Sequence, residues 1–331
     1  MPKKPSKPIT PNAANKELGN FEEIMQLVKP KETSVPELEG IEVYGQSIPL
    51  YTIGGDHITY LDFKKRFDLE ARLRQAYELG QQDVARHLES NRTKAGIYLM
   101  DVNGHQDTDA LPAAMLHQVF LACADYELEM NGRITTNLFE KVNMRFYRST
   151  GIDKMIAGLY GEVATGGNFR FLAQGNPFPV VFSSEYDRFV ELADVCGREF
   201  VPSESIGLLP SGNHIDKRIY RQHVRNFQYK SPYTVNEILI QGVGDILVMF
   251  SDGLSDHSRP LGPDDCVIPD TPDLPENIPR ELYMNLFLED TLRKYKYAPA
   301  KEICAGIAQS VMDFNPVRGD DISYVVIKKT K

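Results

Sequence analysis

The stretch GDILVMFSDGL, residues 244–254, carries the two features that decide the fold. Its central run from Ile246 to Phe250 is entirely apolar, which predicts a short strand. The run begins after Gly244-Asp245 and ends at Ser251-Asp252-Gly253, and both flanks have the composition of turns. The stretch therefore predicts a strand that ends at an aspartate, Asp252.

An aspartate also stands beside three other apolar segments. Asp56 follows a strand-like run from Ile41 to Ile53, Asp101 closes another predicted strand, and Asp320-Asp321 directly precedes the last one. Any single aspartate beside a glycine or a polar turn is explained by turn chemistry alone. Four carboxylates projected from strand ends of a common sheet can nevertheless converge, although they are far apart in the sequence.

Convergent carboxylates would define the chemistry of such a site. They repel one another unless cations hold them together. A set of oxygen ligands suits Mg²⁺ or Mn²⁺, whereas zinc would call for histidine or cysteine. Two such ions about 4 Å apart can generate a hydroxide and neutralise phosphoryl oxygens during in-line attack. Hydrolysis of a phosphate ester is therefore the reaction that this composition favours.

The predicted helices and strands are grouped along the chain and do not strictly alternate. Helices are expected at about residues 20–28, 67–88, 110–130, 136–147, 280–296 and 300–314. Strands are expected at about residues 41–53, 95–102, 155–164, 169–173, 180–183, 237–240, 246–250 and 322–327. The chain contains no G-x-G-x-x-G sequence and no P-loop. The pattern predicts a layered α+β architecture and disfavours a doubly wound nucleotide-binding fold.

Composition limits the class of protein further. A chain of 331 residues that is 42% hydrophobic and 25% charged is an ordinary globular protein. The net charge of −9 argues against a dedicated nucleic-acid binder. No stretch approaches the roughly 20 apolar residues of a spanning helix, and residues 1–8 lack the apolar core of a signal peptide. The four cysteines form no C-x-x-C pair, so neither zinc nor a disulfide framework is indicated. We expect a soluble, cytoplasmic protein without a membrane partner.

Four motifs occur in a fixed order. They are Gly54-Gly55-Asp56, Asp101-Val102-Asn103-Gly104-His105, the stretch at residues 244–254, and Gly319-Asp320-Asp321-Ile322-Ser323. The set resembles the SpoIIE/RsbU branch of the metal-dependent PPM serine/threonine phosphatases, which carry GGD, DVSGHG, GD-apolar-TDG and DDIT in that order. Residues 26–30 and 174–179 show weaker similarity to the same family. The resemblance spans roughly residues 20–329, and its specificity comes from the ordered set.

The resemblance implies a four-layer α-β-β-α sandwich that holds two divalent metal ions, Mn²⁺ or Mg²⁺. Asp101 would bridge both ions, and the carbonyl of Val102 would bind one of them. Asp252 and Asp320 would bind the other ion, and Asp56 would reach the cluster through water. The nucleophile would be metal-bound hydroxide, so no covalent phosphoenzyme would form.

Other positions follow from the resemblance less directly. Gly55, Gly253 and Asp321 would support the site. His105 is a candidate general acid, although a histidine after a glycine in a turn is more often a structural residue. Departures from the family pattern are Gln106, Thr59 in place of a second acidic residue, and Asn176. These departures bear on tuning of the site and leave the four principal aspartates intact.

The expected domain organisation is simple. Residues 1–18, rich in proline and lysine, predict a flexible tail, and residues 19–331 predict one phosphatase domain. A charged helix at about residues 66–92 replaces the short hairpin usual in the family, either as a docking or regulatory element or as a solvated decoration. A basic insertion at about residues 213–231 contains Lys217, Arg218, Arg221 and Arg225. That cluster would steer a phosphoprotein, or would be one side of a loop balanced by neighbouring acids.

The predicted function is dephosphorylation of phosphoserine or phosphothreonine on a regulatory protein. By resemblance, the substrate would be a small STAS-type anti-sigma factor antagonist in a partner-switching circuit. No sensor domain precedes the first helix, so regulation is expected from a separate protein, from a homodimer or from the inserted helix. The alternative is a catalytically silent pseudophosphatase that serves as a binding module. The sequence Asp107-Thr108-Asp109 does not support a haloacid-dehalogenase phosphatase, because it opens a helix beyond a polar turn.

Overall fold

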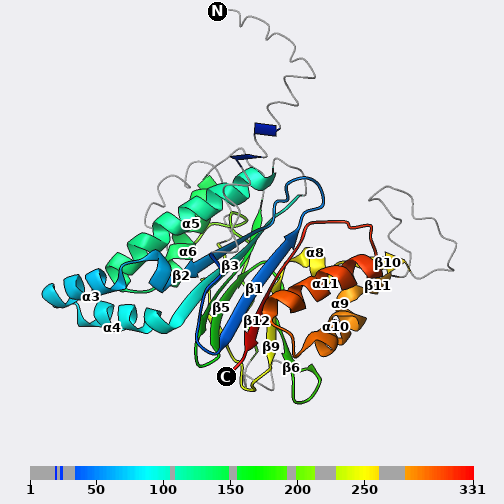
Figure 1. Cartoon of the computed structure of the whole chain (residues 1–331). Coiled ribbons are helices and arrows are strands. Elements are labelled where there is room, and N and C mark those ends of the chain that lie inside the picture. The colour runs from blue at the N-terminus through cyan, green and yellow to red at the C-terminus, as the bar shows by residue number, and fades with distance from the viewer. Residues whose placement is uncertain are drawn as a thin grey trace, which may run out of the picture.

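The computed structural model describes residues 19–20, 23–24, 34–104, 109–148, 155–191, 199–212, 229–260 and 280–331. Two antiparallel five-stranded sheets lie face to face, and helices cover their outer faces (Figure 1). This arrangement is the four-layer α-β-β-α sandwich, so the predicted fold class is confirmed. None of the helices in the described ranges is long and apolar enough to cross a membrane.

The first sheet contains strands from both ends of the described chain. In spatial order it consists of β1 (Ile41–Ile48), β12 (Ile322–Lys329), β9 (Ile246–Phe250), β6 (Val180–Ser183) and β7 (Arg188–Phe189). Its outer face is covered by α10 (Leu288–Tyr295) and α11 (Ala300–Phe314), whose buried residues pack against β9 and β12. Strand β12 pairs with β1 on one side and with β9 on the other. The segment before β12 and the segment after β9 therefore reach the same edge.

The second sheet contains strands from the middle of the described chain. In spatial order it consists of β2 (His57–Asp62), β3 (Lys94–Val102), β4 (Ile156–Ala164), β5 (Asn168–Gln174) and β8 (Asn236–Leu239). Its outer face is covered by α5 (Ala110–Asn131) and α6 (Thr136–Arg148). The short helix α2 (Phe63–Arg66) continues directly from β2, where Asp62 caps it by accepting hydrogen bonds from two backbone N–H groups.

Strand β3 shows why its sequence is apolar without interruption. Ile97 and Leu99 lie in the core between the two sheets, whereas Tyr98 and Met100 lie in the core beneath α5 and α6. Successive side chains of a strand point to opposite faces, and both faces of this strand are covered. The same alternation places Asp101 on the face toward the other sheet, where the strand ends.

The inserted segment forms two helices, so the prediction of one long helix over residues 67–88 was wrong. Helix α3 (Leu69–Glu78) and helix α4 (Gln82–Ser90) are separated by a turn in which Gly80 has a φ of 69°. Glycine adopts this left-handed conformation at little cost, which allows the chain to reverse. The apolar spacing continues through the break, because Leu73 and Leu88 are both buried. A turn η2 (Asn91–Thr93) then leads into β3.

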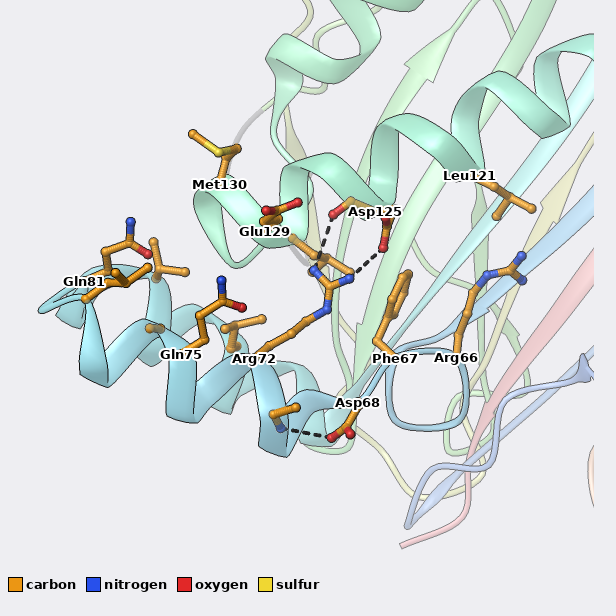
Figure 2. A pocket seen from close by; sticks show the side chains of 16 residues that line it. Arg66, Phe67, Asp68, Arg72, Gln75, Gln81, Leu121, Asp125, Glu129 and Met130 are labelled. Carbon is orange, nitrogen blue, oxygen red and sulfur yellow. Dashed lines mark hydrogen bonds and ion pairs between the residues drawn. The ribbon is translucent and has the colours of Figure 1, made fainter.

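Helices α3 and α4 pack beside α5 and border with it a groove of about 720 Å³ (Figure 2). Arg72 of α3 donates a hydrogen bond of 2.6 Å to the carboxylate of Asp125 on α5. At the start of α3, the Asp68 carboxylate accepts a hydrogen bond from the backbone N–H of Ala71. The inserted segment is therefore attached to the body of the domain and does not project freely into solvent.

The first predicted strand is shorter than expected and a second strand was missed. Strand β1 ends at Ile48, and residues 49–56 form a loop before β2. Arg318 donates hydrogen bonds to the carbonyls of Ile48 and Pro49, and Asp321 accepts one from the backbone N–H of Leu50. Side chains thus take over the backbone partners that a continued strand would have had.

The helix predicted over residues 280–296 starts later than expected. Its first residues form β11 (Arg280–Leu282), which pairs with β10 (Ser258–Pro260), and α9 (Tyr283–Leu286) follows. The predictions for α5, α6, α11 and most strands were correct to within a few residues. A described helical residue pair at Gly19-Asn20 and another at Glu23-Ile24 agree with the first predicted helix. The predicted tail and the basic insertion from residue 213 to residue 228 lie outside the described residues.

Candidate functional site

Asp101 is the central carboxylate of the candidate site. It is the penultimate residue of β3, directly before Val102, and it is only 8% exposed. Its Oδ2 atom is buried without a hydrogen-bond partner. Burial, together with the carboxylates of Asp56 and Asp252, raises the pKa of Asp101 to about 10. A buried carboxylate without counter-charge favours its protonated form for this reason.

Asp56 lies beside it, at the end of the loop that leads into β2. It is 4% exposed, and its Oδ2 accepts a hydrogen bond of 2.9 Å from the hydroxyl of Ser251. Burial raises the pKa of Asp56 well above its usual value, and the carboxylates of Asp321 and Asp320 add to the effect. Asp56 and Asp101 therefore belong to one electrostatically coupled group.

Asp252 and Asp320 complete the group from the first sheet. Asp252 is exposed at the start of the short helix α8 (Asp252–Ser255), and its carboxylate raises the pKa of Asp101. Asp320 is half-buried just before β12, and its charge raises the pKa of both Asp56 and Asp101. The structure thus brings together the four aspartates that were predicted from the sequence. We call the sheet edge that carries Asp56, Asp101, Asp252 and Asp320 the aspartate edge.

Asp321 has a different environment from these four carboxylates. Its side chain is 2% exposed and accepts two hydrogen bonds of 2.6 Å, from the backbone N–H of Leu50 and from that of Gly55. A side chain on Gly54 would meet the Asp321 carboxyl group at 2.6 Å. Asp321 therefore fastens the loop that carries Asp56 to the segment that precedes β12.

Two glycines permit close contact between the motifs. A Cβ atom on Gly55 would lie 3.2 Å from the carbonyl oxygens of Val102 and Gly104. A Cβ atom on Gly253 would collide with the backbone carbonyl of Asp321. At these two positions the backbone of another motif lies so close that only glycine leaves room for it.

A pair of histidines at this edge was not predicted from the sequence. His57, the residue after Asp56, approaches His117 of α5 with 3.1 Å between ring nitrogens, and Thr59 contacts the same nitrogen of His117 at 2.6 Å. Burial lowers the pKa of His117 to about 4, and nearby Arg66 adds to this effect. Thr59, which replaces a second acidic residue of the family pattern, is therefore the partner of a neutral histidine.

Asn176 is a further residue that the structure places near the site. In the second sheet, Asp101 pairs with Ala157, and Gly158 forms a bridge with Gly175. Asn176 therefore lies at the same edge as Asp101, two strands away. Its side chain is 6% exposed, and both of its polar atoms are buried without a partner. Only its similarity to a family turn could have drawn attention to it.

Several predicted residues lie outside the described part of the chain. His105 follows directly after Gly104, where the description stops. The proposed docking residues Lys217, Arg218, Arg221 and Arg225 fall in the range 213–228. Their roles remain predictions.

The donor set fits hard divalent cations, although no coordination group is formed. Within the described ranges, no three His, Cys, Asp or Glu side chains are arranged to hold a metal ion. Instead burial and the carboxylates of Asp56, Asp252 and Asp320 raise the pKa of Asp101, so that its protonated form is favoured while no cation is bound. The Oδ2 atom of Asp101 is buried without a hydrogen-bond partner, so a bound cation would satisfy it. Oxygen donors of this kind suit Mg²⁺ or Mn²⁺.

The family model described as Stage II sporulation protein E (SpoIIE) matches residues 91–330, more than half of the chain. The chain therefore belongs to the SpoIIE family, and the resemblance seen in the sequence is confirmed. No curated protein sequence matches the chain.

Solved structures show the same fold at low sequence identity. The SiaA PP2C domain of Pseudomonas aeruginosa has a TM-score of 0.57 at 14% identity, covering 96% of this chain and 98% of that one. The RsbU and RsbW domains of Rv1364c from Mycobacterium tuberculosis have a TM-score of 0.55 at 15% identity, covering 89% of this chain and 62% of theirs. The PP2C domain and regulatory fragment of SpoIIE from Bacillus subtilis have a TM-score of 0.52 at 13% identity, covering 88% and 64%. This chain thus spans less than two thirds of the latter two.

Proposed function

We propose that this chain is a divalent-cation-dependent phosphatase that acts on phosphoserine or phosphothreonine of a regulatory protein. The observation that carries the proposal is the group Asp56, Asp101, Asp252 and Asp320, which comes from four distant segments. Burial and the neighbouring carboxylates raise the pKa of its two buried members, Asp56 and Asp101. A protein gains nothing in stability from such a group unless something neutralises it. Membership in the SpoIIE family supports phosphate ester hydrolysis as the reaction.

The residues present would hold two divalent cations, Mn²⁺ or Mg²⁺. Asp101, Asp252 and Asp320 would bind them together with the Val102 carbonyl, and Asp56 would contribute through water. When bound, the ions would supply an acidified water and positive charge for the phosphoryl oxygens.

Two residues of the chain would orient the aspartates. Ser251 donates its hydroxyl proton to Asp56 and accepts a hydrogen bond of 3.0 Å from the backbone N–H of Ser323. Asp321 fixes the loop that carries Asp56 through the N–H of Gly55. Such partners of metal-binding carboxylates orient them before the ion arrives, so both act as positioning residues.

A protein substrate suits the exposure of the site. Asp252 is exposed and Asp320 is half-buried, so a phosphate on a protein surface can reach this edge without entering a deep pocket. A STAS-type partner is the specific substrate class that we propose. Structural similarity to RsbU and SpoIIE domains supports it. The basic cluster around Lys217 would assist docking.

The test is hydrolysis of an aryl phosphate and of a phosphoserine peptide with Mn²⁺, with Mg²⁺ and with chelator. We expect turnover only with a divalent ion, and a loss of at least about 10³-fold in Asp252→Asn, which removes a ligand charge with little change in size. Asp313→Asn is the matched control, because Asp313 is exposed on α11, where it accepts a hydrogen bond from Gln309. It should keep the activity of the parent chain.

A thermal melt gives a second readout that does not need a substrate. An ion that binds only the folded state stabilises it by about 2.7 kcal/mol at 100 times its Kd. Mn²⁺ should therefore raise the Tm of the parent chain and of Asp313→Asn, and raise it much less in Asp252→Asn. A folded chain with no turnover on either substrate or on a phosphorylated STAS-domain protein, and with no shift in Tm, would favour the pseudophosphatase alternative.

A further inference from the structure

A second polar site lies at the opposite end of β3 from Asp101. Lys94, the first residue of β3, borders a cavity of about 310 Å³. Because Lys94 and Asp101 are seven residues apart on one strand, roughly 23 Å separates them. Small-molecule sites in proteins typically occupy about 300–1,000 Å³. The cavity is thus large enough for a small ligand and separate from the aspartate edge.

Aromatic rings form one wall of this cavity. Phe139 of α6 and Tyr160 of β4 line it and are buried in the core beneath α6, whereas the lining residue Phe171 of β5 belongs to the core between the sheets. The rings of Phe139 and Tyr160 contact one another with 5.1 Å between their centroids. A wall of this kind provides a flat apolar surface for a planar ligand group.

Three cations from different elements surround a single carboxylate at the same place. Lys94 of β3, Arg133 after α5 and Arg170 of β5 each favour the charged form of Glu162 on β4, whose pKa is nevertheless raised by burial. The hydroxyl of Tyr160 also donates a hydrogen bond of 3.0 Å to Glu162. All four charged residues line the cavity. Three cations and one acid line the cavity, and a second acid, Glu237 of β8, lies opposite Arg170 in the sheet, so positive charge remains in excess here in a chain whose net charge is −9.

The first turn of α6 adds a further site for negative charge. Thr135 and Thr136 line the cavity, and α6 starts at Thr136 and runs for 13 residues. The first backbone N–H groups of a helix have no partner within the helix, and the helix dipole is positive at this end. Anions bind readily at such positions. The helix terminus and the three cations therefore favour the same kind of ligand.

We propose that this cavity binds a small anion in which a doubly charged phosphate-type group is attached to a planar apolar part. The charged group would lie among Lys94, Arg133 and Arg170, close to the start of α6. The planar part would lie against Phe139 and Tyr160. The negative charge of such a group matches the excess of positive charge that Glu162 and Glu237 leave. The inference does not depend on the proposed phosphatase activity, because the two sites are at opposite ends of β3.

The test is calorimetric titration of the full chain with phenylphosphonate, inorganic phosphate and benzyl alcohol. Phenylphosphonate cannot be hydrolysed as a phosphate ester. Chelator in the buffer removes cations from the aspartate edge, so that this edge does not attract phenylphosphonate. We expect phenylphosphonate to bind more tightly than inorganic phosphate, and benzyl alcohol not to bind. Arg133→Gln and Arg170→Gln should each weaken phenylphosphonate binding by roughly tenfold, as expected for loss of a charged hydrogen bond.

Arg74→Gln is the matched control, because Arg74 is exposed on α3 and does not line the cavity. It should bind phenylphosphonate like the parent chain. Equal binding by all three variants would place the ligand elsewhere and overturn the proposal, as would the absence of phenylphosphonate binding to the parent chain. Arg133 and Arg170 are both exposed, so neither variant is expected to unfold, and a thermal melt of each checks this.

Discussion

The carboxylates at the two ends of strand β3 have neighbours of opposite charge. At the Lys94 end, Glu162 is surrounded by cations that the chain itself supplies. At the other end, Asp101 is surrounded by Asp56, Asp252 and Asp320, and every one of these neighbours raises its pKa. Cations within the fold partly offset the effect of burial on the first carboxylate, whose pKa is still raised. The second needs compensation from outside, so one strand separates a region that favours anions from a region that favours cations.

The largest expected effect comes from Asp101→Asn. Because the Asp101 carboxylate is buried among like charges, replacing it should raise the free energy of unfolding of the metal-free protein by about 1–3 kcal/mol. The same substitution should abolish metal-dependent turnover. Urea unfolding in chelator and an aryl phosphate assay in Mn²⁺ measure the two effects. A less stable variant would show that Asp101 is compensated by the fold after all.

The same exchange at Asp321 should have the opposite sign. Asp321→Asn keeps the size of the side chain but turns one acceptor of the two backbone N–H groups into a donor. Loss of a charged hydrogen bond in a buried position should lower the free energy of unfolding by about 2–3 kcal/mol. Unfolding of Asp321→Asn and Asp101→Asn in one experiment provides the comparison. If both variants shift in the same direction, the distinction between the fastening aspartate and the metal-binding aspartates fails.

Glu162→Gln sharpens the comparison from the other end of β3. Removing this negative charge should leave the surplus of positive charge in the cavity larger. Phenylphosphonate binding should tighten by about three- to tenfold, since an opposing charge a few ångströms away is removed in a partly solvated site. Glu185→Gln, exposed in the turn after β6, removes a charge remote from the cavity and should have no effect. Weaker binding in Glu162→Gln would show that Glu162 itself contacts the ligand as an acceptor.

The smallest effect concerns His117 at the aspartate edge. Its pKa of about 4 lies below the usual 6.5, so folding favours the neutral ring and the unfolded chain takes up the proton first. This contribution to stability is present above about pH 6.5 and is lost as the pH falls toward 4. Partial exposure of the ring limits it to about 1 kcal/mol. His117→Gln should reduce the difference in unfolding free energy between pH 7.5 and pH 5, and an unchanged difference would contradict the role.

The sequence alone located the aspartates because each stands in a short local pattern. Asp252 follows an apolar run, and Asp56 and Asp320 stand beside glycines, so no knowledge of distant contacts was needed. Their distinct roles were not predictable in the same way. Asp320 and Asp321 are adjacent and chemically identical, and only the backbone N–H groups of a loop about 270 residues earlier distinguish them.

The cavity, the break between the inserted helices and strand β2 could not be predicted from local sequence patterns. Lys94, Arg133, Glu162 and Arg170 come together because β3, β4 and β5 are neighbours, and no local pattern records that pairing. The break at Gly80 was missed because apolar residues keep a helical spacing on both sides of it. Strand β2 was missed because His57–Asp62 mixes polar and apolar residues, although burial covers all six of them.

The position of β12 has a consequence for synthesis of the protein on the ribosome. This strand lies between β1 and β9 in the first sheet, and the aspartates that precede it fasten the loop beside Asp56. A nascent chain that has not yet released residues 320–329 from the exit tunnel lacks the centre of a sheet whose first strand was made almost 300 residues earlier. Domains generally fold as units during translation, so the aspartate edge forms only after β12 has left the exit tunnel. A ribosome stalled shortly before this point would carry all the other strands of both sheets without the aspartate edge.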